Sequence, residues 1–152
     1  MRKIELWRFR GDTIVFTNGC FDILHLGHVE YLQKARSFGN RLIVGLNSDD
    51  SVRRQGKPGA LRPINPEGAR AGVLAALTCV DAVIIFGEDT PLNLIVEILP
   101  DILAKGADYK PEEVVGYQEV KKNGGQTICV PLTEGFSTTK IISQILSNHE
   151  GD

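Results

Sequence analysis

Short apolar runs alternate with longer amphipathic stretches from one end of the chain to the other. Five runs are largely apolar and are bounded by polar residues, Gly or Pro, which is typical of buried parallel strands. These predicted strands cover 13–17, 42–46, 82–86, 102–104 and 127–130. The pattern predicts an α/β fold, a Rossmann-like open sandwich with a five-stranded parallel sheet buried on both faces and helices on both sides.

Helices are expected between and after these strands. The periodic stretches predict them over 27–38, 66–77, 91–99, 111–123 and 138–147. Asn65 is the expected N-cap of the second helix, with Pro66 at its first helical position.

The segment 48–65 does not follow this rhythm. It is polar, it carries Arg53, Arg54, Lys57 and Arg62, and it is longer than a usual connection from strand to helix. Ligands of parallel α/β sheets bind at the carboxyl ends of strands, and this segment leaves the second strand at that end. We therefore expect a long loop that could close over a ligand.

Length and composition narrow the class of protein. The 152 residues fit a single domain, 1–152, and 42% hydrophobic with 24% charged residues is typical of a globular, non-membrane chain. The net charge of -2 provides no basic field for nucleic acid. Cys20, Cys79 and Cys129 suit neither a disulfide framework nor a CxxC site, and Glu5 and Arg8 interrupt any signal peptide. A cytoplasmic location is expected.

The most informative stretch follows the first strand. A Gly-containing turn, Asn18 to Asp22, leads to His25-Leu26-Gly27-His28 at a predicted helix start. Free N–H groups and the helix dipole make such a start an anion site, and residues three apart lie on one face. Two isolated histidines would more often be a cap and a surface residue. Here two of the three histidines flank Gly27, which lets a ligand approach the backbone closely, and this favours phosphate binding.

Other phosphate and metal motifs fit poorly. No third ligand lies near the two histidines, so a zinc site is not predicted. No GxGxxG follows the first strand, and Gly56-Lys57 is followed by Pro58, which does not fit a P-loop.

A second candidate anion site opens the last predicted helix. Ser137, Thr138 and Thr139 place hydroxyls and free N–H groups together at this helix start. Alone, this would be an ordinary helix cap. Together with the histidine turn, and with Lys57 and Arg62 available from the long loop, it indicates the seat of a polyphosphate.

These residues resemble the nucleotidyltransferases that carry an HxGH signature, the cytidylyltransferase-like superfamily. Within it the chain is most similar to the adenylyltransferase domains of bacterial ADP-heptose synthases, over nearly all of the chain after residue 12. The similar segments are 17–25, 47–49, 62–66, 88–91, 99–101, 105–113 and 137–139. The block Lys105-Gly-Ala-Asp-Tyr-Lys-Pro is the most selective of them.

The resemblance implies a reaction and a set of site residues. AMP would pass from ATP, with Mg²⁺, to D-glycero-D-manno-heptose 1-phosphate, giving ADP-heptose and pyrophosphate for the lipopolysaccharide inner core. The catalytic residues would be His25, His28 and Lys57. The nucleotide would contact Asn18, Gly19, Cys20, Phe21, Gly27, Lys105, Asp108, Ser137, Thr138 and Thr139. The sugar phosphate would contact Asp22, Asn47 and Arg62, and no residue is assigned as a metal ligand.

Alternatives and partners follow from the same resemblance. One alternative is a glycerol-phosphate cytidylyltransferase. Those enzymes have an Arg where this chain has Leu132, which weakens this alternative. Another acceptor or nucleotide, or a nucleotide-binding module without catalysis, remains open. The resemblance implies a separate sugar kinase that supplies the substrate and a homodimer, with neither nucleic acid nor membrane as partner.

Overall fold

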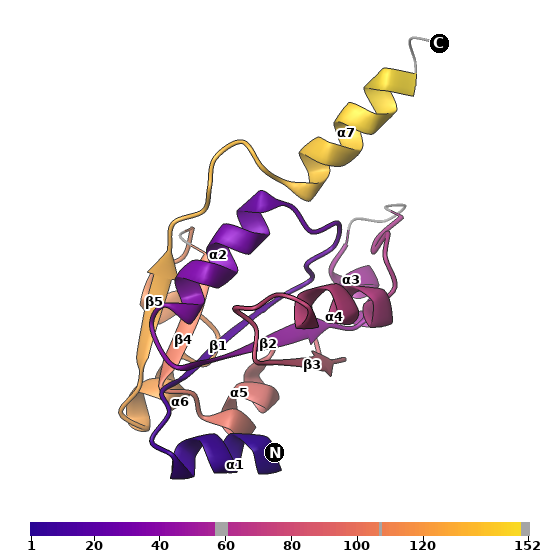
Figure 1. Cartoon of the computed structure of the whole chain (residues 1–152). Helices are drawn as coiled ribbons and strands as arrows, with labels where there is room; N and C mark the ends of the chain where they lie inside the picture. The colour runs from indigo at the N-terminus through magenta and orange to yellow at the C-terminus, as the bar shows by residue number, and fades with distance from the viewer. Residues whose placement is uncertain (57–60, 107, 150–152) are drawn as a thin grey trace.

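The computed structural model describes residues 1–56, 61–106 and 108–149. A five-stranded parallel sheet forms the centre of the molecule, with strand order β3-β2-β1-β4-β5 (Figure 1). The strands are β1 (Ile14–Gly19), β2 (Arg41–Asn47), β3 (Ala82–Phe86), β4 (Ile102–Gly106) and β5 (Gln126–Val130). All five predicted strands are confirmed, as is the open α/β sandwich.

The described residues also form seven α-helices and one 3-10 helix. They are α1 (Arg2–Phe9), α2 (Leu26–Arg36), α3 (Asp49–Gln55), α4 (Glu67–Ala75), α5 (Leu92–Ile98), η1 (Pro111–Glu113), α6 (Tyr117–Lys122) and α7 (Thr138–His149). Among these residues no helix combines the length and the apolar character needed to cross a bilayer.

Two apolar clusters hold α1, α2, α4, α5 and α6 on opposite faces of the sheet. On one face, Leu32 of α2 and Leu74 of α4 pack on the strands and are fully buried. On the other face, Trp7 of α1, Ile95 of α5 and Val120 of α6 belong to the second cluster. Because burial of such side chains is worth about 1.5–3 kcal/mol each, the two clusters fix the sheet that positions the loops.

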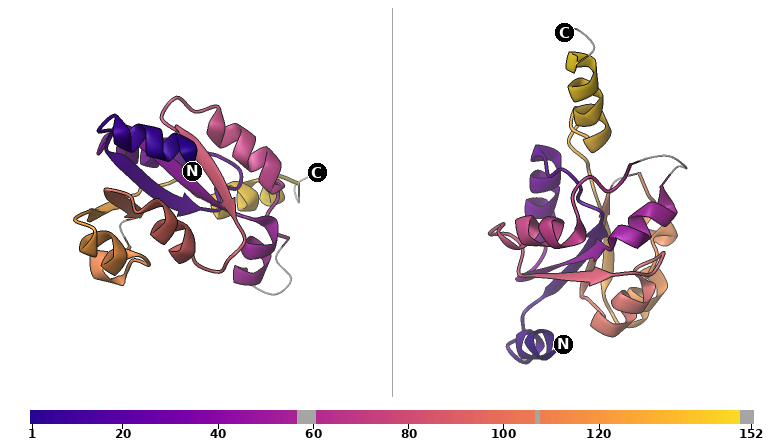
Figure 2. Two further views of the ribbon diagram at one scale, coloured as in Figure 1. Left: turned by 90° about the horizontal axis from the view of Figure 1, so that it is seen from below. Right: turned by 90° about the vertical axis from the view of Figure 1, so that its right-hand side faces the viewer.

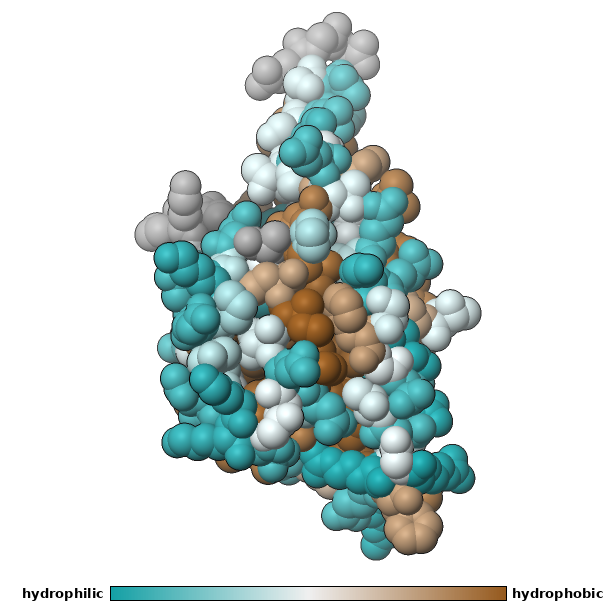
Figure 3. Space-filling view, turned by 90° about the vertical axis from the view of Figure 1, so that its left-hand side faces the viewer, coloured by the Kyte–Doolittle hydropathy of each residue, from teal (hydrophilic) through white to brown (hydrophobic). Residues whose placement is uncertain are grey.

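The outer strands differ from the expectation that every strand is buried on both faces. β3 and β5 lie at the two edges of the sheet, and most of their residues are partly exposed. An edge strand has a neighbour on one side only, so solvent reaches its side chains. A band of apolar residues also reaches the surface on the side where β5 lies (Figure 3).

The segment after β2 was expected to be one long loop, and this was wrong for its first half. Residues 49–55 form α3, because the Ser48 hydroxyl accepts a hydrogen bond from the Ser51 N–H and caps the helix. Asp49 and Asp50 complement the dipole in the first turn. The expected closing lysine, Lys57, lies outside the described residues.

Two helix predictions also needed correction. Helix α4 has Pro66, not Asn65, as its N-cap, since the Pro66 carbonyl accepts the first intrahelical hydrogen bond, from the Arg70 N–H at 3.0 Å. The single helix expected over 111–123 is interrupted at Gly116, which has a φ of +90°. A Cβ there would lie 2.8 Å from Ile95 Cδ1, so this turn brings the backbone against α5.

Helix α7 projects away from the rest of the molecule, and none of its residues is buried (Figures 1 and 2). Its first turn, in contrast, lies against the carboxyl ends of the strands, where it contributes to the site described next.

Candidate functional site

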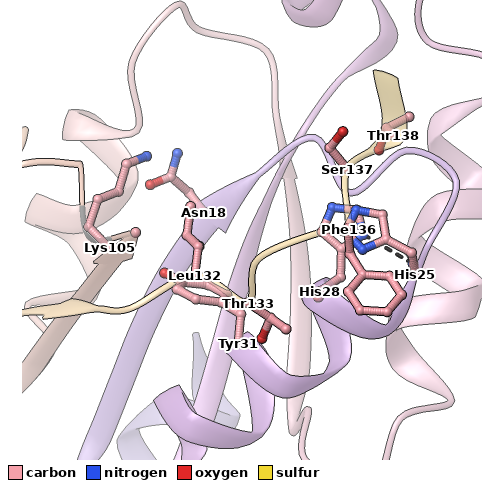
Figure 4. Close-up of a pocket in the computed structure, with 12 residues that line it drawn as sticks. Asn18, His25, His28, Tyr31, Lys105, Leu132, Thr133, Phe136, Ser137 and Thr138 are labelled. Atoms are coloured by element: carbon pink, nitrogen blue, oxygen red, sulfur yellow. Dashed lines mark hydrogen bonds between the residues drawn. The ribbon is translucent and has the colours of Figure 1, made fainter. Parts of the chain in front are cut away.

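A cleft of about 320 Å³ opens at the carboxyl ends of β1 and β4. The starts of α2 and α7 form one end of it, and Lys105 and Asn18 lie at the other (Figure 4). Its lining comprises Asn18, His25, Gly27, His28, Tyr31, Lys105, Gly106, Leu132, Thr133, Phe136, Ser137 and Thr138. The two anion sites expected from the sequence therefore meet in one cleft.

The two histidines stack at the start of α2. His25 is the N-cap and His28 the third helical residue, and their ring centroids are 3.8 Å apart with an angle of 23° between the planes. The His28 Nδ1 accepts a hydrogen bond from the His25 backbone N–H at 3.3 Å. Since Nδ1 is the acceptor, neutral His28 carries its proton on Nε2, which is left as a donor. Phe21 contacts the His28 ring edge-on, with centroids 5.4 Å apart.

Both imidazoles favour the neutral form. Burial, and secondarily the charge of His25, lowers the pKa of His28 to about 4. Burial also lowers the pKa of His25. The pair therefore supplies hydrogen-bond donors to the cleft at neutral pH, rather than two positive charges.

The start of α7 lies beside the histidines at the same end of the cleft (Figure 4). The Ser137 hydroxyl accepts a hydrogen bond from the Lys140 N–H at 3.0 Å. The Thr138 hydroxyl donates to the Asp22 carbonyl oxygen at 2.8 Å. The first amides of α2 and α7 have no intrahelical acceptor, so two positive dipole ends converge on the same space.

The opposite end of the cleft carries a cation and an aromatic side chain. Burial lowers the pKa of Lys105, and its Nζ lies 5.6 Å from the centroid of the Tyr109 ring. The Tyr31 hydroxyl lies 2.7 Å from Thr17 Oγ1, and burial raises the pKa of Tyr31 to about 12. Tyr31 thus remains a neutral part of the cleft wall.

A second, larger cavity of about 880 Å³ lies between α3, residues 61–64 and α7. Its polar lining includes Gln55, Arg62, Thr139 and Ser143, and Val52, Leu61 and Ile142 belong to its apolar wall. Arg62 Nη1 lies 3.6 Å from Asp22 Oδ2 and is buried without a hydrogen bond to any described residue. Because the Arg62 side chain is 30% exposed and lines the cavity, it can also meet an anionic ligand there.

Several other residues expected at the site lie outside the lining of the cleft. Cys20 and Thr139 line the second cavity rather than the cleft. Asp22 and Asn47 are buried and hydrogen-bonded within the protein, Asn47 through its amide to the Ser51 hydroxyl. Gly19 lies against the Phe21 ring, where a Cβ would be 3.0 Å from Cε2. Asp108 is exposed in a turn outside the cleft lining.

Sequence reasoning missed five residues of the cleft. They are Tyr31, Gly106, Leu132, Thr133 and Phe136. Tyr31 could have been predicted as a cleft residue, because it lies three residues after His28 on the same face of the helix. Leu132 and Thr133 follow the carboxyl end of β5, where ligand contacts are expected in a parallel sheet.

No group of three or more His, Cys, Asp or Glu side chains suitable for a metal ion occurs within 1–56, 61–106 and 108–149.

Comparison with known proteins gives a family and close relatives. The family model described as cytidylyltransferase-like matches residues 16–144. The chain is 55% identical over 147 residues to a protein named bifunctional protein HldE from Syntrophotalea carbinolica, covering 97% of this chain and 30% of that protein. A protein of the same name from Geotalea uraniireducens is 59% identical over 142 residues, covering 93% of this chain and 29% of that protein. The chain thus spans about a third of these relatives' length.

Solved structures share the fold of this chain. A lipopolysaccharide core biosynthesis protein from Thermoplasma volcanium is 32% identical, with a TM-score of 0.66, covering 81% of this chain and 98% of that one. A pantothenate synthetase from Thermus thermophilus, 17% identical, shares the fold with a TM-score of 0.52, covering 78% of this chain and 55% of that one. With the two helix starts joined in one cleft and the model matching 16–144, this chain belongs to the cytidylyltransferase-like family.

Proposed function

We propose that this protein transfers AMP from ATP to D-glycero-D-manno-heptose 1-phosphate. A phosphate oxygen of the sugar 1-phosphate attacks the α-phosphorus of ATP and forms a new P–O bond. The bond between the α-phosphorus and the oxygen bridging to the β-phosphate breaks, and pyrophosphate leaves with that electron pair. The products are ADP-heptose and pyrophosphate, and no covalent intermediate on the enzyme is needed.

The observation that carries this proposal is the meeting of the stacked histidines and the start of α7 in one cleft. His28 Nε2–H is the donor left over after Nδ1 accepts the His25 N–H. It donates to an oxygen of the α-phosphate, and His25 donates to the bridging oxygen. These bonds strengthen as negative charge develops on the leaving group, so they lower the barrier.

Charge and orientation come from the rest of the cleft. Ser137 and the free amides at the start of α7 hold the β- and γ-phosphates, together with the positive end of the helix dipole. Lys105 contributes positive charge from the opposite end of the cleft, and Lys57 is proposed to neutralise the phosphates as well. Thr138 is proposed as a further nucleotide contact, whereas Thr139 lines the second cavity.

The acceptor is assigned to the second cavity. Arg62 offers a guanidinium group to the sugar phosphate, and Gln55 and Ser143 offer hydrogen bonds to hydroxyl groups. The name of the Thermoplasma volcanium protein supports a role in lipopolysaccharide core synthesis. The similarity of 105–113 to heptose adenylyltransferases favours a heptose over glycerol.

Mg²⁺ is proposed to arrive as part of the substrate, MgATP. The described residues hold no group of three or more His, Cys, Asp or Glu side chains that suits a metal ion, and Mg²⁺ is usually held by one or two carboxylates together with substrate phosphates and water. A sugar kinase acting before this protein and a homodimeric state remain proposals.

An assay of nucleoside triphosphates against phosphorylated acceptors tests the proposal. We expect pyrophosphate release with ATP and heptose 1-phosphate together, and with neither alone. His28→Ala should lower kcat/KM about 100-fold or more, because it removes a donor to the reacting phosphate. His149→Ala, at the other end of α7, is the matched control and should retain activity. Unchanged turnover in His28→Ala, or release with glycerol 3-phosphate and CTP only, would contradict the proposal.

A further inference from the structure

Asp22 connects the two cavities through two separate parts of the residue. Its side chain is 3% exposed, with Oδ2 accepting the Ile64 N–H at 2.7 Å and Oδ1 accepting the Asn65 N–H at 3.0 Å. Its backbone carbonyl accepts the Thr138 hydroxyl at 2.8 Å. The loop beside the second cavity and the start of α7 are therefore attached to one residue.

Arg70 reinforces the same connection from the other side. It is 2% exposed, and its Nε donates to the Asn65 carbonyl at 2.9 Å while its Nη1 donates to the Cys20 carbonyl at 2.7 Å. Its Nη2 pairs with Asp49 at 2.7 Å. The turn after β1 and the loop 61–65 are consequently joined by two buried charged groups whose hydrogen bonds are made within the protein.

From this arrangement we infer that Asp22 is a positioning residue that couples binding in the second cavity to binding in the cleft. Its carboxylate oxygens are already used by two backbone amides, so it holds the loop that carries Arg62 rather than contacting the sugar itself. The inference rests on the proposed function, because it assigns the acceptor to the second cavity and ATP to the cleft.

The coupling runs through a continuous set of contacts. A ligand in the cleft orders the start of α7, which fixes Thr138 against the Asp22 carbonyl. A fixed Asp22 in turn holds the amides of Ile64 and Asn65, and with them the loop that bears Arg62. A second ligand then meets a loop that is already ordered and binds more tightly, and by linkage each ligand strengthens the other equally.

Backbone amide hydrogen exchange can measure this coupling in the absence of the acceptor substrate, heptose 1-phosphate. We expect the non-reactive analogue α,β-methylene-ATP to slow exchange of the Ile64 and Asn65 amides by about fivefold or more, within the usual range of coupling between sites. Calorimetry on the same samples establishes that the analogue binds. Asp22→Asn should abolish the slowing, because an amide NH₂ replaces one acceptor oxygen.

Two further variants separate coupling from loss of structure. Thr138→Val keeps the shape of the side chain, leaves the loop bonds intact and should also abolish the slowing. Asp101→Asn is the matched control: Asp101 Oδ2 accepts the Ile14 N–H at 2.7 Å, at the amino ends of β1 and β4 and away from both cavities. In this variant, α,β-methylene-ATP should slow exchange of the Ile64 and Asn65 amides as much as it does in the parent.

Kinetics give a second readout. In the parent the KM for ATP should fall as heptose 1-phosphate rises, and in Asp22→Asn the two KM values should become independent. The inference would be overturned if the analogue binds without slowing exchange at Ile64 and Asn65. It would also be overturned if the analogue still slows this exchange in Asp22→Asn. Either result would leave the proposed function standing. Absence of analogue binding would overturn the inference together with the proposed function.

Discussion

At the residue scale, the His28 tautomer depends on one backbone amide. The His25 N–H occupies Nδ1, so the proton of the neutral ring lies on Nε2, the atom left to donate into the cleft. The stacked His25 ring and burial both oppose a positive charge on His28. A site for polyanions can thus use neutral histidines, while helix termini and lysines provide the positive potential.

The lowered pKa of His28 predicts a specific dependence of stability on pH. The pKa of His28 is about 4 in the folded protein and has its ordinary value of 6.5 in the unfolded chain, so between these values the unfolded chain binds more protons than the folded one. The free energy of unfolding should be fully retained above pH 6.5 and should fall as the pH is lowered toward 4. His28→Gln should show a smaller fall, measured by urea denaturation at pH 7.5 and pH 5.

The control for this prediction is His149→Gln, since His149 is exposed in the last turn of α7. Its unfolding free energy should change with pH as in the parent. An equal pH dependence in His28→Gln and the parent would show that the stacked pair is not the source of the effect.

Residue types at the site were easier to predict than their roles. His25, His28 and Ser137 were placed correctly in one cleft, because the spacing of a strand, a turn and a helix start fixes their positions. Asp22 was expected to contact the sugar, and its carboxylate instead accepts amides more than 40 residues away. Such long-range bonds leave no local signal in the sequence.

At the scale of the element, the start of α2 is built around Gly27. A Cβ at this position would lie 3.0 Å from His25 Cε1 and Nδ1 and 3.2 Å from Phe136 Cβ. A side chain there would press on the ring that begins the helix and on the loop that leads to α7. The glycine therefore permits the close approach of the two helix starts.

Gly27→Ala should therefore impair catalysis more than folding. Displacement of the His25 ring should lower kcat/KM about 10- to 100-fold, because small misplacements of a reacting group are costly. The unfolding temperature should change little. The matched control is Gly72→Ala in α4, where a Cβ meets nothing within 4 Å; it should stabilise by about 0.5–1 kcal/mol and keep full activity. Equal activity of the two variants would argue against the crowding at Gly27.

A comparison of the predicted and observed limits of helices and strands shows where local sequence patterns were sufficient to predict them. The strand 82–86 was predicted with its observed limits, because apolar residues there are flanked by Asp81 and Gly87. Helix α1 was not expected, since only Ile4 and Trp7 among its eight residues are buried. Helix α3 was missed because its composition is polar and its stability depends on the Ser48 cap. Short helices with few buried positions carry a weak periodic signal.

At the scale of the whole molecule, the sheet determines which distant segments meet. Parallel strands with the order β3-β2-β1-β4-β5 place the carboxyl ends of β1 and β4 side by side. The turn after β1 and Lys105 at the end of β4 then border one cleft. The alternation of apolar runs predicted a parallel sheet, whereas the strand order, which decides these neighbours, came only from the structure.

The whole-molecule arrangement also predicts how the protein responds to removal of divalent ions. Its two apolar clusters account for the packing of α1, α2, α4, α5 and α6 on the sheet, and the described residues provide no group of three metal-ligating side chains. EDTA should therefore leave the unfolding temperature unchanged, since no folding free energy would come from a bound metal. Pyrophosphate release should stop and return with excess Mg²⁺, because the phosphates of ATP would hold the ion. A lower unfolding temperature in EDTA would instead indicate a resident metal site, and activity that persists in EDTA would contradict MgATP as the substrate.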